Sequence, residues 1–179
     1  MLRPAFLFFA FVDASLLFGM SMNWLVPSTG ISPERPLPAA ENLAIIVNRS
    51  NPVENLSTPE LRRIFLGERG HWPNGRRITI VMIEPGQPER DVVLRDIFRM
   101  TETEFNNHFL HGVFTGEVLV SPKTLATPVG VRKFVFNVPG AIGYLRVSDV
   151  DASVKVVRID ERYPDDKAYP FHVPPQPAN

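Results

Sequence analysis

The chain has 179 residues, with 19 Lys and Arg against 19 Asp and Glu, and it contains no cysteine. This length predicts one domain plus appendages, with a core large enough to be stable without disulfides. The zero formal net charge argues against a nucleic-acid-binding surface, and the lack of cysteine excludes thiolate catalysis and Cys-based zinc sites.

The N-terminus is apolar. Residues 4–22 are almost all hydrophobic and follow Arg3, a pattern typical of a secretory signal or a signal anchor. Asp13 lies within the run, where a charge at the bilayer centre costs about 2.5–3.5 kcal/mol. We interpret residues 1–26 as a signal peptide or signal anchor, with a hydrophobic helix of the folded domain as the alternative. The protein is then periplasmic, or anchored to the membrane and facing the periplasm.

A Pro-dotted linker, residues 27–42, leads to the first predicted strand. Residues 43–47 (LAIIV) form a continuous apolar run, which suits a strand covered on both faces, as in a parallel sheet. Ser57 and Glu60 have the spacing of a capping box, so a helix is expected to begin there. Gly67 is suited to end that helix in a left-handed conformation.

A second buried strand is predicted at residues 78–83 (ITIVMI), after a tight WPNG turn. Trp72 in that turn is expected to pack over the end of the preceding helix, with ligand stacking as the alternative. Residues 84–89 (EPGQPE) form a Gly/Pro loop that leads into a helix over residues 90–100.

The order strand, Gly-containing loop, helix brings free backbone N–H groups and the helix dipole to one point, which favours an anion. Arg90 adds a bidentate donor in the first turn of the helix. Glu84 and Glu89 place negative charge nearby, which opposes an anion. Any strand–loop–helix unit has this shape, so the motif alone is compatible with a purely structural role.

A second capping box, Thr101 with Glu104, predicts a further helix, followed by a turn at residues 113–116. His108 and His111 lie one helical turn apart, but no third ligand is apparent, so no metal site is predicted.

The rest of the chain alternates again. A helical region is expected over residues 121–137, broken or restarted at Pro128, and strands at residues 141–145 and 154–159. Residues 43–160 then form the folded domain. Residues 161–179 are interpreted as a Pro-rich C-terminal tail, extended or disordered.

The resulting β-α-β-α-α-α-β-β order predicts an α/β sheet flanked by helices. Several segments, in order, resemble the PBP-like domain of phosphate ABC-transporter substrate-binding proteins, the PstS-like group. They are the SxxELRRIFLG helix, the WPNG turn, EPGQPERDVVLRDIF, VFTGEVLVSP and VPGAIGYL. The resemblance spans about residues 43–159. It implies a type II periplasmic-binding-protein fold, an exported protein, and phosphate or a similar oxyanion as ligand.

On this resemblance, Gly86, Gln87 and Arg90 match the binding loop of the family, and Asn48 lies at a corresponding edge of the sheet. These four are the predicted ligand-binding residues. The loop departs from the family pattern, in which Ser-Gly-Thr precedes the arginine, so two hydroxyl donors are missing and Pro88 removes one N–H.

A second departure concerns size. Family members carry an earlier segment with Gly/Ser-rich loops that hold phosphate in the first lobe, and residues 23–42 do not supply it. The chain therefore resembles a short, single-lobe-like member, truncated relative to a two-lobe receptor.

Two functions follow. The first is a solute-binding module that binds phosphate or another small oxyanion and works with an ABC-transporter permease or a membrane sensor. The second is an accessory or interaction module that kept the fold and lost the ligand. An enzyme is not predicted, because the chain has no P-loop, nucleotide fingerprint or Ser-centred elbow, and no cofactor is expected. Self-association is predicted, because a half-sized receptor would expose its interdomain cleft.

Overall fold

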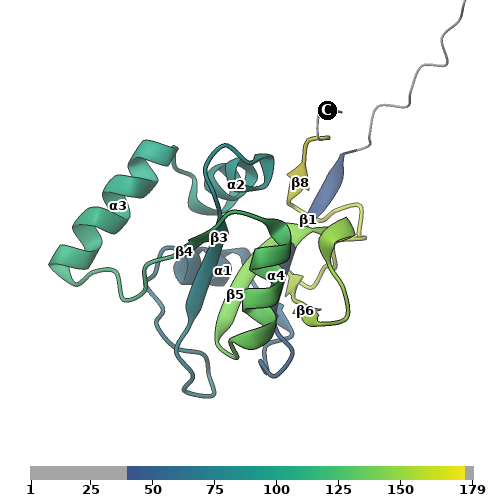
Figure 1. Cartoon of the computed structure of the whole chain (residues 1–179), viewed down its shortest axis with the longest axis horizontal. Coiled ribbons are helices and arrows are strands. Elements are labelled where there is room, and N and C mark those ends of the chain that lie inside the picture. Colours follow the sequence, from purple (N-terminus) through teal and green to yellow (C-terminus); the bar gives the residue numbers. More distant parts are fainter. Residues whose placement is uncertain (1–39, 176–179) are drawn as a thin grey trace, which may run out of the picture. The chain divides into compact units, whose positions relative to one another are not determined.

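A mixed six-stranded sheet runs through the computed structural model, which describes residues 40–175 (Figure 1). Its strand order is β4-β3-β5-β1-β6, and β8 also pairs with β1. The strands are β1 Glu41–Asn48, β3 Thr79–Ile83, β4 Lys123–Leu125, β5 Ala141–Arg146, β6 Val154–Val156 and β8 His172–Val173. A separate short parallel pair joins β2, Asn55–Leu56, to β7, Arg158–Ile159.

Strand direction corrects one expectation. β3 runs parallel to β4 and β5, whereas β1 runs antiparallel to β5, β6 and β8. The prediction that β1 is covered on both faces is confirmed: Ile45 belongs to one hydrophobic core and Ile46 to the other. A continuous apolar run reports burial on two faces, and it carries no information about the direction of the partner strand.

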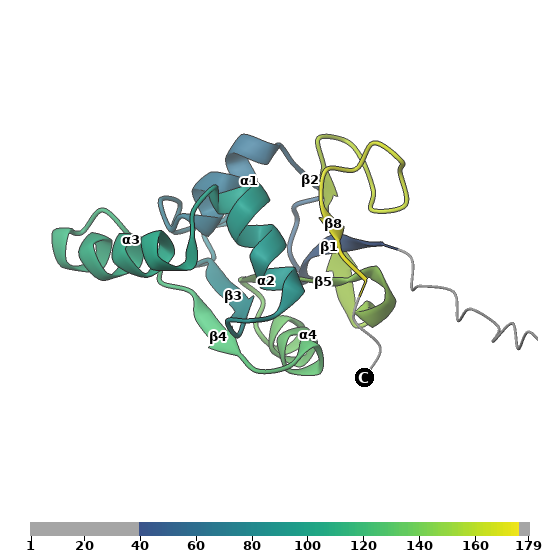
Figure 2. The ribbon, with the colours of Figure 1, turned by 90° about the horizontal axis from the view of Figure 1, so that it is seen from above.

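Helices cover both faces of the sheet, as Figure 2 shows. The larger core lies under α1, Thr58–Phe65, and under α2, Pro88–Val92, which continues as a π-helix over Val93–Phe98. The smaller core lies under α4, Pro128–Asn137. The fold is thus an α/β sheet flanked by helices, as predicted.

The start and end of α1 confirm the local prediction. The Ser57 hydroxyl accepts a hydrogen bond from the Glu60 N–H, and the Glu60 carboxylate accepts one from the Ser57 N–H at 3.0 Å. Gly67 has φ +77°, and a Cβ there would lie 2.5 Å from the Val120 carbonyl oxygen. Trp72 is 2% exposed, and its indole N–H donates to the Gly140 carbonyl at 2.9 Å. The ring is therefore a core residue and no open surface for stacking.

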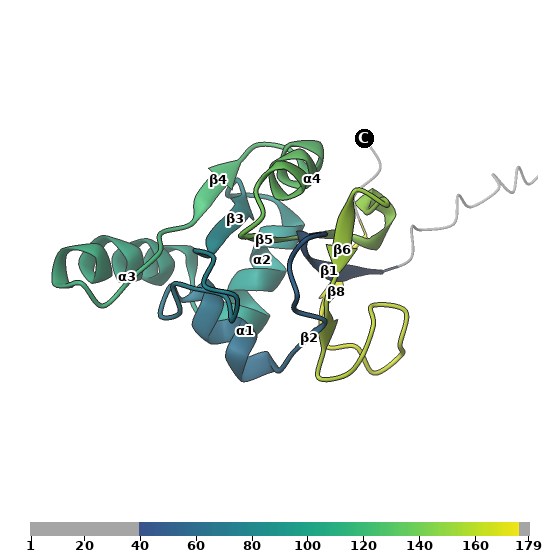
Figure 3. The ribbon, with the colours of Figure 1, turned by 90° about the horizontal axis from the view of Figure 1, so that it is seen from below.

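The middle of the chain differs from prediction in two places. The helix after β3 begins at Pro88 and not at residue 90, because proline fits the first position of a helix. α3, Glu102–Thr115, runs through the predicted turn at residues 113–116 and ends where Gly116 adopts φ +76°. Figures 2 and 3 show that α3 extends beyond the β4 edge of the sheet, away from β6.

The C-terminal segment corrects the predicted tail. Tyr169, Phe171 and Val173 are at most 1% exposed, and Leu43 N–H donates to the Phe171 carbonyl at 3.0 Å. The folded domain therefore continues past residue 160, to β8. A Pro-rich composition excludes regular helix, but it does not prevent alternate apolar side chains from packing against an edge strand.

The predicted signal or anchor, residues 1–26, lies outside the described residues, as does most of the predicted linker. Within residues 40–175, no helix is long and apolar enough to cross a membrane.

Candidate functional site

The loop between β3 and α2 is the site that the sequence predicts. Pro85 and Gly86 occupy the central positions of a turn, and Gly86 has φ +85°, as the third residue of a type II turn requires. Nothing lies within 4 Å of a Cβ built on Gly86, so the turn is open to solvent. The Glu84 N–H donates to the Leu125 carbonyl at 3.0 Å, which fixes the loop above the β3–β4 edge.

The start of α2 offers few donors for an anion. Gln87 is the N-cap residue, and its side chain makes no capping hydrogen bond. Pro88 at the first helical position has no N–H to donate. The Arg90 and Asp91 N–H groups both donate to the Gln87 carbonyl, at 2.9 and 3.2 Å. The Arg90 amide, which could otherwise face a ligand at the helix start, is thus used within the turn, and the Asp91 amide makes the first regular bond of the helix.

The Arg90 side chain is bound from within the protein. Its Nε and Nη2 donate to the two carboxylate oxygens of Glu102 at 2.8 and 2.7 Å, and its Nη1 donates to the Ile83 carbonyl at 2.9 Å. The guanidinium also lies 4.9 Å from the ring centroid of Phe105. Arg90 is only 2% exposed. It therefore joins the end of β3 to the first turn of α3 and does not project into solvent.

A second buried ion pair lies beside the first. Glu89 is 4% exposed and pairs with Arg146, the last residue of β5. Arg146 also donates to the Pro174 carbonyl at 3.1 Å and lies 3.9 Å from Glu41. The charge of Glu89, which the sequence interpretation set against anion binding, is thus balanced inside the protein.

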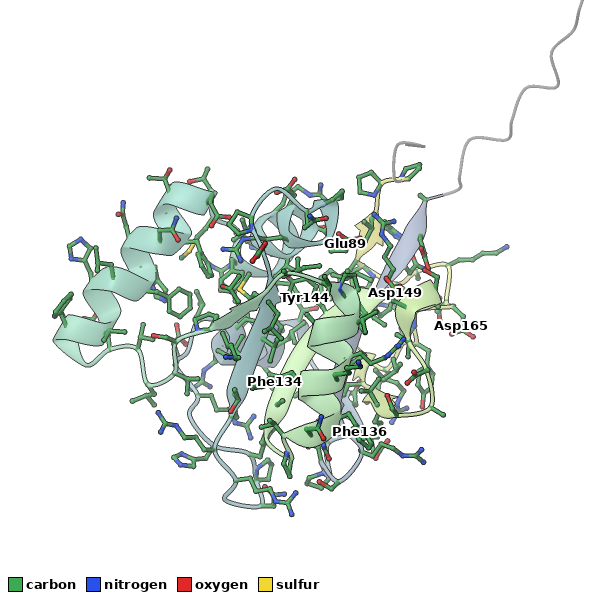
Figure 4. The ribbon with its side chains drawn as sticks, in the orientation of Figure 1. Glu89, Phe134, Phe136, Tyr144, Asp149 and Asp165 are labelled. Atoms are coloured by element: carbon green, nitrogen blue, oxygen red, sulfur yellow. The ribbon has the colours of Figure 1, made fainter. Side chains whose placement is uncertain are left out.

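Two further titratable groups, Asp149 and Tyr144, lie near these pairs. Burial raises the pKa of Asp149, and the carboxylates of Glu41 and Glu89 raise it further. Burial also raises the pKa of Tyr144, whose hydroxyl oxygen accepts the Ile83 N–H at 3.1 Å. Figure 4 shows Glu89, Tyr144 and Asp149 at the same end of the sheet. Burial, the largest cause, favours the protonated form of Asp149, and the Arg132 and Arg146 cations partly offset the two carboxylates.

Asn48 lies at the opposite end of the sheet from Arg90. β1 is antiparallel to β5, which is parallel to β3, so the C-terminal ends of β1 and β3 point in opposite directions. By the register, Asn48 lies level with Ala141 and Ile83 with Leu145, so about four residues of β5, roughly 13 Å, separate the two edges. The Asn48 amide donates to the Val135 and Phe136 carbonyls at 2.9 and 2.6 Å, and its oxygen accepts the Ser50 N–H at 2.9 Å. The side chain holds the end of α4 against β1.

Of the four predicted ligand-binding residues, the structure brings Gly86, Gln87 and Arg90 together and leaves Asn48 apart. Sequence reasoning missed Glu102 and Arg146, which form ion pairs with the buried side chains of Arg90 and Glu89. No short spacing signals either pairing, because Glu102 lies 12 residues from Arg90, and Arg146 lies 57 from Glu89. Within residues 40–175, no three His, Asp or Glu side chains are grouped so as to hold a metal ion.

The fold is that of a lobe of a periplasmic binding protein. Solved structures of phosphate receptors share its architecture. A putative phosphate ABC-transporter substrate-binding protein from Clostridium perfringens, with bound phosphate, is 23% identical at a TM-score of 0.63, over 76% of this chain and 54% of that chain. PstS from Borrelia burgdorferi is 13% identical at a TM-score of 0.59, over 76% and 56%.

An ABC-type phosphate transport receptor from Vibrio cholerae is 22% identical at a TM-score of 0.54, over 70% of this chain and 49% of that chain. The chain thus spans about half the length of the receptors it matches. The structural likeness shows the PstS-like fold alone, and the matched proteins are receptors rather than enzymes. No protein-family model matches the chain.

Proposed function

We propose that this protein is an accessory or interaction module, built on a PstS-like solute-binding lobe, that does not hold an oxyanion at residues 84–90. One observation carries the proposal: the Arg90 guanidinium is buried and bound in a bidentate pair by Glu102. A phosphate would have to displace that carboxylate, and phosphate brings no geometric advantage, because both groups accept the same two parallel N–H bonds.

The binding of phosphate or a similar oxyanion by Gly86, Gln87 and Arg90 is the second candidate. The fold shared with phosphate receptors favours it, as does the open turn at Gly86. It requires Glu102 to release Arg90. Part of the Glu102 side chain, 36%, is exposed, so the carboxylate has a route to solvent.

Isothermal titration of the full chain with phosphate, sulfate and molybdate separates the two candidates. We expect no saturable heat at ligand concentrations of about 1–10 mM, which would detect a binding free energy as weak as about −4 kcal/mol. Glu102→Gln is the matched variant, because it keeps the shape and removes the competing charge. Saturable binding by the unchanged protein would overturn the proposal. Binding that arises only in Glu102→Gln would support it, because Glu102 is then what closes the site.

The second part of the proposal is export, with a membrane protein as partner, either an ABC-transporter permease or a membrane sensor. The apolar residues 4–22 after Arg3 support it. Fusion of alkaline phosphatase, which is active only outside the cytoplasm, to the C-terminus tests it. We expect an active fusion, and an inactive one when residues 1–26 are removed. Equal activity of the two fusions would contradict export through this segment.

A further inference from the structure

The distal end of α3 presents an apolar surface to solvent. Leu110, Val113 and Phe114 on α3 are 58%, 54% and 83% exposed, and Leu119 in the following segment is 55% exposed. We call these four side chains the α3 face. They leave roughly 400 Å² of apolar surface open, within the range in which exposed patches mark interaction sites.

Helical geometry separates the α3 face from the core. Leu110, Val113 and Phe114 have the spacing i, i+3, i+4, so they share one side of the helix. Phe105 and Phe109, on the other side, are buried against the body of the domain. The face therefore cannot be covered by rotation of α3 without exposing the two phenylalanines that attach it.

The α3 face carries no formal charge. The segment from residue 106 to residue 116 contains no Asp, Glu, Lys or Arg. A surface of this composition gains little from a charged partner. Two formal charges adjoin the α3 face, the exposed Glu117 between Phe114 and Leu119 in the chain, and the exposed Arg77, and their opposite signs suit pairing between two identical surfaces.

A hollow of about 500 Å³ adjoins the face. Ile78, Val113, Val118 and Leu119 supply apolar lining, and the exposed Arg77 lies beside them. Phe114, the most exposed large apolar side chain among the described residues, follows directly after Val113 in the chain. Val113 and Leu119 belong both to the α3 face and to the lining of the hollow, so the face and the hollow are continuous.

We propose that the α3 face binds a second copy of this chain in a two-fold symmetric dimer, in which Phe114 of each copy enters the hollow of the other. A two-fold contact needs the same surface on both partners, with each projecting group close to the recess that receives its mate. The α3 face has both. Arg77 then lies where it can stack on the entering ring.

The area agrees with this occupant. A stable interface buries about 800 Å² on each partner, of which a little over half is apolar. The roughly 400 Å² of the α3 face supplies most of that apolar part. The proposal does not involve residues 84–90, so its failure would leave the proposed function standing, and the reverse.

Sedimentation velocity of the full chain at about 1–100 µM tests the dimer. We expect Phe114→Asp to weaken self-association at least about 30-fold, as loss of a central aromatic anchor does. Phe136→Asp is the matched control: Phe136 is 53% exposed but lies on α4, and its substitution should leave the dimer intact. Thermal unfolding checks that both variants fold.

The cysteine-free chain allows a second measurement. A single cysteine at the exposed Thr115 should form a disulfide-linked dimer under mild oxidation, whereas one at the exposed Lys133 on α4 should not. A monomer throughout the concentration range would overturn the proposal. Association that is unchanged in Phe114→Asp would overturn it as well. So would a monomeric protein that binds anionic phospholipid vesicles and loses this binding in Phe114→Asp, because the α3 face would then contact a membrane.

Discussion

The two ends of α3 make opposite use of their side chains. At its start, Glu102 takes up the guanidinium of Arg90, in the loop where family resemblance predicts a ligand. At its end, Phe114 is 83% exposed, in a segment where the sequence predicts an ordinary turn. The arginine of the predicted binding loop is thus satisfied internally, whereas Phe114, in the VFTGEVLVSP segment that also resembles the family, is open to solvent. One helix therefore closes the predicted ligand loop at its start and exposes apolar side chains at its end.

The largest effect is expected at the start of α3, where Glu102 binds Arg90. Glu102→Ala leaves the buried Arg90 guanidinium without its partner, and because the Glu102 side chain is 36% exposed, so that water can partly replace it, we expect a loss of about 2–3 kcal/mol. Urea unfolding measures the loss. Glu117→Ala, at an exposed position just past α3, should change stability by less than about 0.5 kcal/mol.

Equal stabilities of these two variants would break the comparison. Arg90 would then gain nothing from Glu102 and could accept an external anion at no cost. Oxyanion binding by Gly86, Gln87 and Arg90 would then be possible, because Glu102 could release Arg90.

The parts of the fold that could be predicted are those set by neighbours in the chain. The Ser57–Glu60 and Thr101–Glu104 boxes each close within four residues, so their helix starts are written in the sequence. Strand direction and the packing of Tyr169 and Phe171 depend on partners that lie far away in the chain, such as Ala141 for Thr79 and Leu43 for Phe171. Apolar runs and proline content carry no record of such pairings.

The candidate site was predictable only in outline. The loop with Gly86 and the helix after it follow from local chemistry. Whether Arg90 faces solvent depends on where α3 places Glu102, a tertiary fact with no sequence spacing of its own. Asn48 was assigned from the family resemblance alone, and the antiparallel pairing of β1 with β5 puts it at the other edge of the sheet.

A smaller effect is expected at the end of α3, beside the α3 face. A Cβ on Gly112 would lie 2.2 Å from Val118 Cγ2, so Gly112→Ala must push Val118 away from α3. Overpacking of this kind costs about 1–3 kcal/mol. It should also disturb the hollow that Val118 lines and so weaken the dimer.

Thermal unfolding and sedimentation of Gly112→Ala measure both effects. Asn106→Ala, at an exposed position on the same helix, should change neither. A stable Gly112→Ala protein with an unchanged dimer would show that the hollow does not receive Phe114.

The smallest effect concerns Asp149 and Asp151, two aspartates after β5 whose pKa values are shifted in opposite directions. Burial and the Glu41 and Glu89 carboxylates raise the pKa of Asp149, whereas hydrogen bonds from Ser153 lower the pKa of Asp151. A raised carboxyl pKa stabilises the fold below the unfolded value of about 4, and this stabilisation is lost as pH rises through the folded value. A lowered pKa stabilises the fold above that value and is lost on acidification.

Relative to the unchanged protein, Asp149→Asn should therefore gain stability as pH rises from about 3 to 7. The gain is a few tenths of a kcal/mol, because solvent screens this partly exposed group. Asp151→Asn should lose stability over the same range. Urea unfolding at several pH values measures both slopes. If Asp149→Asn also loses stability over this range, Arg132 and Arg146 outweigh burial and the two carboxylates. The local potential is then positive, and it favours a bound anion at this end of the sheet.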